Sequence, residues 1–200
     1  MFIYLVFNQK FMRRETVDIL KAWSAISVAF AILLSGGVAF DIKFLTAFLI
    51  SAFTVGIGFL FHELAHRTLA RNYGAKAEFR SFDQMLILAI LMSFFGFILA
   101  APGAVFIRGH VNKEKYGKIS AVGPMTNIIL SVIFLVVFLL GIQTLNILAF
   151  YGKTINAWLA LFNMIPFGNF DGVKILMWNK AVYGLMVAVA LALVLIPISL

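Results

Sequence analysis

Apolar residues follow one another in long blocks that short polar segments separate. A block of about twenty such residues matches the length that a helix needs to cross a hydrocarbon layer about 30 Å thick. A shorter aromatic and branched run, residues 2–7, is more typical of a strand or an interfacial segment. The longer blocks predict membrane-spanning helices at residues 22–40, 44–64, 119–140, 145–165 and 181–200.

One further apolar block, residues 84–106, has an ambiguous course because Gly96, Pro102 and Gly103 interrupt it. If this block dips into the membrane and returns, fourteen of the sixteen Lys and Arg residues lie inside and two outside. If it crosses fully, the split becomes nine inside and seven outside. Because cytoplasmic loops carry the excess of basic residues, the count predicts a re-entrant element, with a β-hairpin as one reading of its form.

The pattern therefore predicts an all-α polytopic membrane protein with about five transmembrane helices and a re-entrant element at 84–106. We expect one membrane-embedded domain over residues 1–200, without a PDZ or other soluble regulatory domain. Its expected place is the cell membrane, with the N-terminus on the cytoplasmic side.

Composition agrees with this class of protein. The chain is 63% hydrophobic and 12% charged, whereas soluble domains average about 45–50% and about 25%. The net charge of +8 comes from short basic clusters between the apolar blocks, which is typical of a topology signal and not of nucleic-acid binding. There is no cysteine, so no thiolate can bind a metal.

A metal-binding pattern, His62-Glu63-Leu64-Ala65-His66, ends the second predicted span. Histidines four residues apart lie on one face of a helix, where both can bind a tetrahedral Zn²⁺. Glu63 is offset by about 100° around the helix, so it can reach a metal-bound water and accept its proton. Because ionisable residues at membrane depth are costly, the pattern predicts a functional site on the cytoplasmic side of the membrane interior.

A catalytic zinc normally has three protein ligands, so a third must come from elsewhere. Asp171 is the favoured candidate, because it lies at the same predicted inner edge as the two histidines and stands alone in an apolar region. His110 is the weaker alternative, since a lone histidine in a loop is more often solvated.

Two asparagines interrupt later apolar blocks. Asn127 follows Gly123 and Pro124, and Asn163 lies eight residues before Asp171. Amides within membrane helices often link one helix to another. An amide near the metal could instead donate a hydrogen bond to the oxyanion of a peptide under attack.

These motifs together resemble the site-2 protease family of intramembrane zinc metalloproteases. The resemblance covers roughly residues 44–175 and rests on motifs that come in this order: His62-Glu63-x-x-His66, Gly123-Pro124-x-x-Asn127, Asn163 with Pro166, and Asp171-Gly172.

The resemblance implies hydrolysis of a peptide bond within or next to the transmembrane helix of a membrane-spanning protein or peptide. It implies one Zn²⁺ per chain, held by His62, His66 and Asp171, with Glu63 as the catalytic acid and base. The two asparagines would position the substrate or stabilise the oxyanion. Because a substrate helix must unwind before attack, the 84–106 element could pair with it as an added strand.

Two other functions compete with this one. A different membrane zinc protease would take its third ligand from a glutamate on a later helix, but no glutamate follows Glu114. A metal transporter or non-enzymatic scaffold could use the same histidines. A transporter would more often show interrupted spans repeated in two halves, and the chain has no such repeat.

Overall fold

The structure is a computed structural model that describes residues 2–38, 41–98 and 102–198. Helices dominate it, and one π-helical turn and two short strands complete it. In chain order the elements are α1 (Phe2–Ser35), α2 (Ile42–Ser51), η1 (Ala52–Gly56), α3 (Ile57–Asn72), β1 (Lys76–Ser81), α4 (Asp83–Ser93), β2 (Gly103–Arg108), α5 (Lys113–Leu139), α6 (Gln143–Asn163), α7 (Asp171–Trp178) and α8 (Lys180–Leu195).

Three helical stretches are long and apolar enough to cross a membrane. They are Arg14–Ser35, the continuous stretch Ile42–Asn72 and Lys113–Leu139. They coincide with three of the predicted spans, which supports a membrane protein. The other two predicted spans correspond to α6 and to α8, an apolar helix of 16 residues. That these two also cross the membrane, which would make five spans, stays a prediction.

The ambiguous block 84–106 is partly helical, so a β-hairpin within it is wrong. Its first half forms α4, whose 11 residues extend about 16 Å, which is too short to cross the hydrocarbon layer. The sheet forms instead between β2 and β1, and β1 comes from the polar segment before the block. Ser81 pairs with Gly103, so the segment between the two strands begins and ends at the same place, as a re-entrant element requires.

The first residues of the chain also differ from the prediction. Residues 2–7 belong to α1 and do not form a strand. A short aromatic and branched run has strand propensity when read by itself, but a helix that continues without a break into the first span overrides this weak preference.

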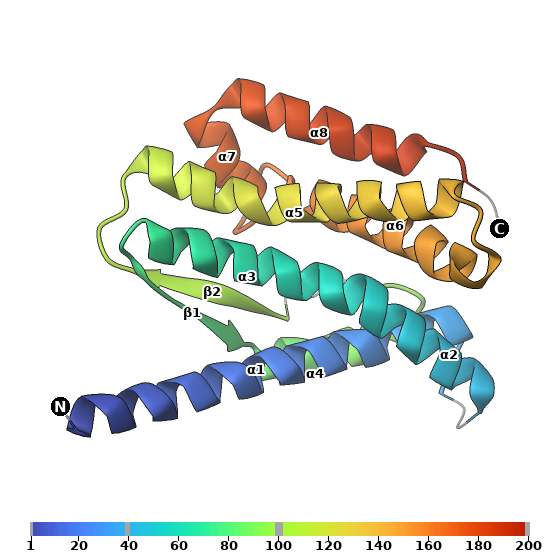
Figure 1. Cartoon of the computed structure of the whole chain (residues 1–200), viewed down its shortest axis with the longest axis horizontal. Coiled ribbons are helices and arrows are strands. Elements are labelled where there is room, and N and C mark those ends of the chain that lie inside the picture. Colours follow the sequence, from blue (N-terminus) through green and yellow to red (C-terminus); the bar gives the residue numbers. More distant parts are fainter. Residues whose placement is uncertain (1, 39–40, 99–101, 199–200) are drawn as a thin grey trace.

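The elements form two groups joined by α3 (Figure 1). One group contains α1, α2 and α4, and the other contains α5, α6, α7 and α8, with the small sheet beside α3. Close packing in the second group depends on glycines that the large side chains of neighbouring helices cover. Trp178 lies against Gly117, and Phe134 lies against Gly152. Small residues at such positions let membrane helices approach closely.

One buried carboxylate connects the first group to α3 and the sheet. Glu15 of α1 is 6% exposed. It accepts hydrogen bonds from Arg67 of α3 (2.9 Å) and from the backbone N–H of Phe79 in β1 (3.0 Å). Arg71 lies 3.5 Å from the same carboxylate and donates to the carbonyl of Ala77 at 2.6 Å. The outer edge of β1 is therefore capped by side chains.

Replacing this carboxylate should weaken the fold. In Glu15→Leu, the buried N–H of Phe79 loses its acceptor, at a cost of about 1–3 kcal/mol, and the thermal unfolding midpoint in detergent should fall. The matched control is Glu114→Leu, which removes an exposed pair with Lys118 and should change the midpoint little. Equal shifts in the two variants would contradict the role given to Glu15.

Candidate metal centre

The helix that carries the two histidines begins with a π-helical turn. Within η1 the backbone N–H of Ile57 reaches back five residues to the carbonyl of Ala52, which also accepts from the indole of Trp23 in α1 (3.3 Å). A side chain at Gly56 would collide with Trp23 and Ser27, so α1 holds this turn closely. A π-helical turn adds one residue to the helix and rotates all later side chains, and such turns are frequent at functional sites.

After this turn, three ligand atoms from α3 and α7 meet in the interior. His62 and His66 come from α3, and Asp171 is the first residue of α7. The Nε2 atoms of the two histidines are 3.0 Å apart. Oδ2 of Asp171 lies 3.3 Å from Nε2 of His62 and 3.1 Å from Nε2 of His66. All three residues are at least nine-tenths buried.

The opposite nitrogen of each histidine has a partner from α5. Nδ1 of His62 lies 2.6 Å from Oδ1 of Asn127, and Nδ1 of His66 lies 2.6 Å from the carbonyl oxygen of Ile119. Since both partners are oxygens that accept, both Nδ1 atoms are the donors. The Nε2 atoms therefore carry lone pairs, and both point toward the same carboxylate.

Zinc fits this arrangement. Ligand bonds of about 2.0–2.1 Å in a tetrahedron place neighbouring ligand atoms about 3.3 Å apart, close to the three separations of 3.0–3.3 Å. Two lone pairs and a carboxylate at such distances repel one another unless a cation lies between them. Histidine and carboxylate ligands with supporting hydrogen bonds on the far nitrogens are also typical of zinc centres.

Space for the ion depends on Gly123 of α5. A Cβ atom there would collide with Nε2 of His66 and would lie 2.6 Å from Nε2 of His62. Gly123 therefore lets α5 pass beside the ligand atoms while leaving their lone pairs free.

Glu63 lies next to the sheet and is partly buried. Its carboxylate lies near the backbone N–H of Val105 in β2. Val105 pairs with Phe79, whose N–H points away from β2 toward Glu15. In an antiparallel ladder, the backbone N–H and C=O groups of two opposite residues point either both toward each other or both away from each other. The backbone groups of Val105 therefore also point away from β1, toward the free edge of β2.

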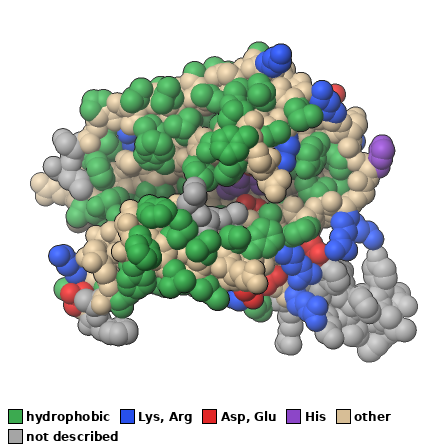
Figure 2. Space-filling view, turned by 180° about the vertical axis from the view of Figure 1, so that it is seen from behind, with side chains coloured by type: hydrophobic (Ala, Val, Ile, Leu, Met, Phe, Trp, Pro, Cys, Tyr) green, Lys and Arg blue, Asp and Glu red, His purple; other side chains and the backbone are tan. Residues whose placement is uncertain are grey.

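The structure brings most of the predicted site residues together. Among the described residues, the group that could hold a metal contains His62, His66 and Asp171. The alternative third ligand, His110, lies exposed after β2 and is not in this group. Figure 2 shows histidine and acidic side chains at the floor of a hollow between the two groups of helices.

The two predicted asparagines have different surroundings. Asn127 is fully buried, and its amide donates to the carbonyl of Gly58 (3.1 Å) and to Oδ1 of Asn156 (3.0 Å). Both hydrogens of that amide are thus used within the protein. Asn163 donates to the carbonyl of Leu159 in its own helix (2.9 Å). The predicted roles of these two residues at the substrate stay predictions.

Neither Asn156 nor Glu15 is among the site residues that the sequence predicts. Both are buried and bonded to residues that surround the metal-binding helix. Asn156 lies seven residues before Asn163, so the two share one face of α6. That spacing was the available signal for Asn156.

Comparison with known proteins gives one relative at high similarity. The chain is 38% identical over 182 residues to the protein named "Putative zinc metalloprotease MJ0611" of Methanocaldococcus jannaschii, and the match covers 88% of this chain and 91% of the relative. No protein-family profile and no solved structure matches the chain. The name of the relative and the three-residue ligand group together support zinc as the cofactor.

A methyl group added at Gly123 should interfere with zinc binding. Gly123→Ala places a Cβ against both Nε2 atoms, so zinc affinity should fall at least 10-fold to 100-fold, the range seen when the support of a metal ligand is lost. Competition with a zinc chelator measures this. Gly184→Ala is the control, because a Cβ there has nothing within 4 Å. Wild-type zinc affinity in Gly123→Ala would rule out the proposed position of the ion.

Proposed function

This chain belongs to the zinc metalloprotease family of its archaeal relative, and from that membership we propose that it is an intramembrane protease. It would hydrolyse a peptide bond within or next to a substrate's transmembrane helix, as in the site-2 protease family. The observation that carries the proposal is the depth of the ligand group. His62 and His66 lie within an apolar helical stretch long enough to cross a membrane.

The depth follows from helix geometry. Ile42–Asn72 has 31 residues and extends about 46 Å, some 16 Å more than the hydrocarbon layer. If the excess is shared between its two ends, His62 lies about 7 Å inside the layer. Arg67 begins the basic end of the helix, where it pairs with Glu15 of α1. Water from the cytoplasmic side would then reach the site over a short distance.

The outer surface of the helices supports contact with lipid. On α5, Ile129, Ile133 and Val136 are about half exposed, at 52%, 51% and 50%. On α4, Ile87 and Leu91 are 61% and 54% exposed. A water-soluble monomer rarely exposes so continuous an apolar surface. With the basic loops inside, the site and the N-terminus would both lie toward the cytoplasm.

The free edge of β2 is the proposed place for the substrate backbone. Since the backbone N–H and C=O groups of Val105 point away from β1, those of Gly103 and Ile107, two residues before and after it, do so as well. The opposite edge, on β1, is capped by Glu15 and Arg71. An unwound substrate segment would pair with β2 by strand addition, and its scissile bond would then lie beside Glu63.

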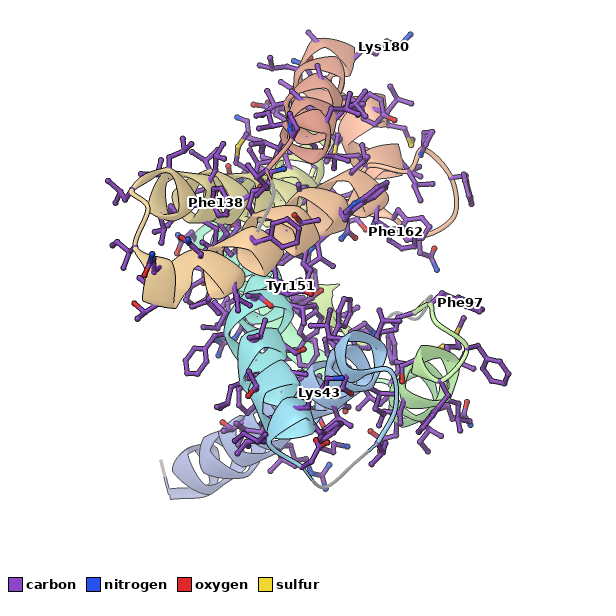
Figure 3. The ribbon with its side chains drawn as sticks, turned by 90° about the vertical axis from the view of Figure 1, so that its right-hand side faces the viewer. Lys43, Phe97, Phe138, Tyr151, Phe162 and Lys180 are labelled. Atoms are coloured by element: carbon purple, nitrogen blue, oxygen red, sulfur yellow. The ribbon has the colours of Figure 1, made fainter. Side chains whose placement is uncertain are left out.

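The approach to this edge runs between the two groups of helices. In Figure 3, Phe97 belongs to the segment after α4, and Phe162 lies on α6 in the opposite group, on the same side of the molecule. Phe97 is 52% and Phe162 36% exposed. These aromatic side chains would contact the apolar residues of a membrane-spanning substrate.

The proposed chemistry assigns a role to the metal, to Glu63 and to Asn163. Zinc, held by His62, His66 and Asp171, supplies a Lewis acid that polarises the carbonyl to be attacked. Glu63 would take the proton of the attacking water and give it to the leaving nitrogen. Asn163 would release the carbonyl of Leu159 and donate to the developing oxyanion.

The central test separates metal binding from catalysis. Glu63→Gln keeps all three ligands, so it should retain one zinc per chain while cleavage of a single-span substrate peptide in detergent falls at least 10²-fold to 10⁴-fold. Zinc content and product formation are measured on the same preparation. Cleavage at the wild-type rate would contradict the role of Glu63. A wild-type enzyme that cleaves soluble peptides but no membrane-spanning ones would contradict the intramembrane function.

A further inference from the structure

Two fully buried asparagines on neighbouring helices connect the metal centre to the backbone of α6. Asn127 of α5 contacts Nδ1 of His62, and Asn156 of α6 contacts Asn127. Both side chains are 0% exposed. A buried amide is costly unless its donors and acceptors are paired, and here the pairing fixes the direction of every hydrogen bond.

The directions follow from two backbone carbonyls, which can only accept. The carbonyl of Gly152 lies 2.9 Å from Nδ2 of Asn156, so that atom is the nitrogen and the oxygen of Asn156 faces Asn127. The carbonyl of Gly58 lies 3.1 Å from Nδ2 of Asn127. The nitrogen of Asn127 therefore faces two acceptors, and its oxygen faces His62.

The end of this chain of bonds is the ring of His62. Because the oxygen of Asn127 can only accept, Nδ1 of His62 must carry the hydrogen, and Nε2 is left with the lone pair that a metal needs. We propose that Asn156 is a positioning residue that, through Asn127, sets the tautomer and the ring orientation of His62 for zinc binding.

The packing around Asn156 supports this role over simple attachment of α6 to α5. A Cβ at Gly58 would collide with Oδ1 of Asn156, so α3 has a glycine where the amide passes, one helical turn before His62. Another buried bond between α5 and α6, from Ser131 to the carbonyl of Lys153 (2.8 Å), already links these helices. That bond joins Ser131 and Lys153 without involving a metal ligand, so it provides a matched control.

The inference rests on the zinc ligand set of the proposed function but not on proteolysis, and the test measures metal binding directly. In Asn156→Ala, Asn127 loses one of its two acceptors. Zinc affinity, measured by chelator competition on the full chain in detergent, should fall about 10-fold, the lower end of the effect of outer-shell partners. The absorption spectrum of bound Co²⁺ should change, since it reports the ligand geometry. Ser131→Ala should change neither.

A second variant keeps the test decisive if Asn156→Ala does not fold. Asn156→Asp, when protonated, offers one donor and one acceptor, enough for the two hydrogen bonds that the amide makes here. Its zinc affinity at low pH should therefore approach that of the wild type measured at the same pH. Wild-type affinity and Co²⁺ spectrum in Asn156→Ala would overturn the proposal. An equal loss in Ser131→Ala, or an equal loss in Asn156→Asp at every pH, would overturn it as well. If the zinc effects appear as expected but the wild-type protein cleaves no peptide, the result would count against the proposed function alone.

Discussion

Three electron-pair donors converge in the interior of this protein, and the geometry of the site depends on what lies between them. The two Nε2 atoms and Oδ2 of Asp171 are 3.0–3.3 Å apart, and the hydrogens on the far nitrogens of both histidines are committed to oxygens of α5. A cation bound between them would turn this repulsion into attraction. Zinc binding would therefore hold Asp171 of α7 beside α3, as in other proteins where the binding of a metal contributes folding energy.

The elements around the metal centre position its residues. The π-helical turn η1 rotates the histidines toward α5, and Gly123 leaves room for their lone pairs. Glu15 anchors the sheet so that its capped edge faces α1 and its free edge, at Val105, faces Glu63. The carboxylate proposed as the catalytic group and the edge proposed to receive a substrate strand thus both lie at the same small sheet. This juxtaposition explains why a protein built mainly from helices keeps two strands beside its metal.

The sequence allowed good prediction where a local rule decides the structure. Helix periodicity brings His62 and His66 together, and the charge count predicted that 84–106 returns to its starting face, which the pairing of Ser81 with Gly103 supports. Prediction failed where distant contacts decide. A polar segment becomes β1 only because α1 and α3 supply partners for its edge, and the block after it becomes a short helix. The burial of Asn156 is likewise visible only once α3, α5 and α6 are packed.

The most direct test of the central claim is X-ray absorption at the zinc edge of the purified protein, compared with Asp171→Ala. The account predicts a four-coordinate zinc in the wild type, with two imidazole nitrogens and light-atom ligands at about 2.0–2.1 Å, and a zinc that is lost or has an altered first shell in the variant. The claim would be contradicted by identical spectra from the two proteins, or by a wild-type spectrum without imidazole ligands.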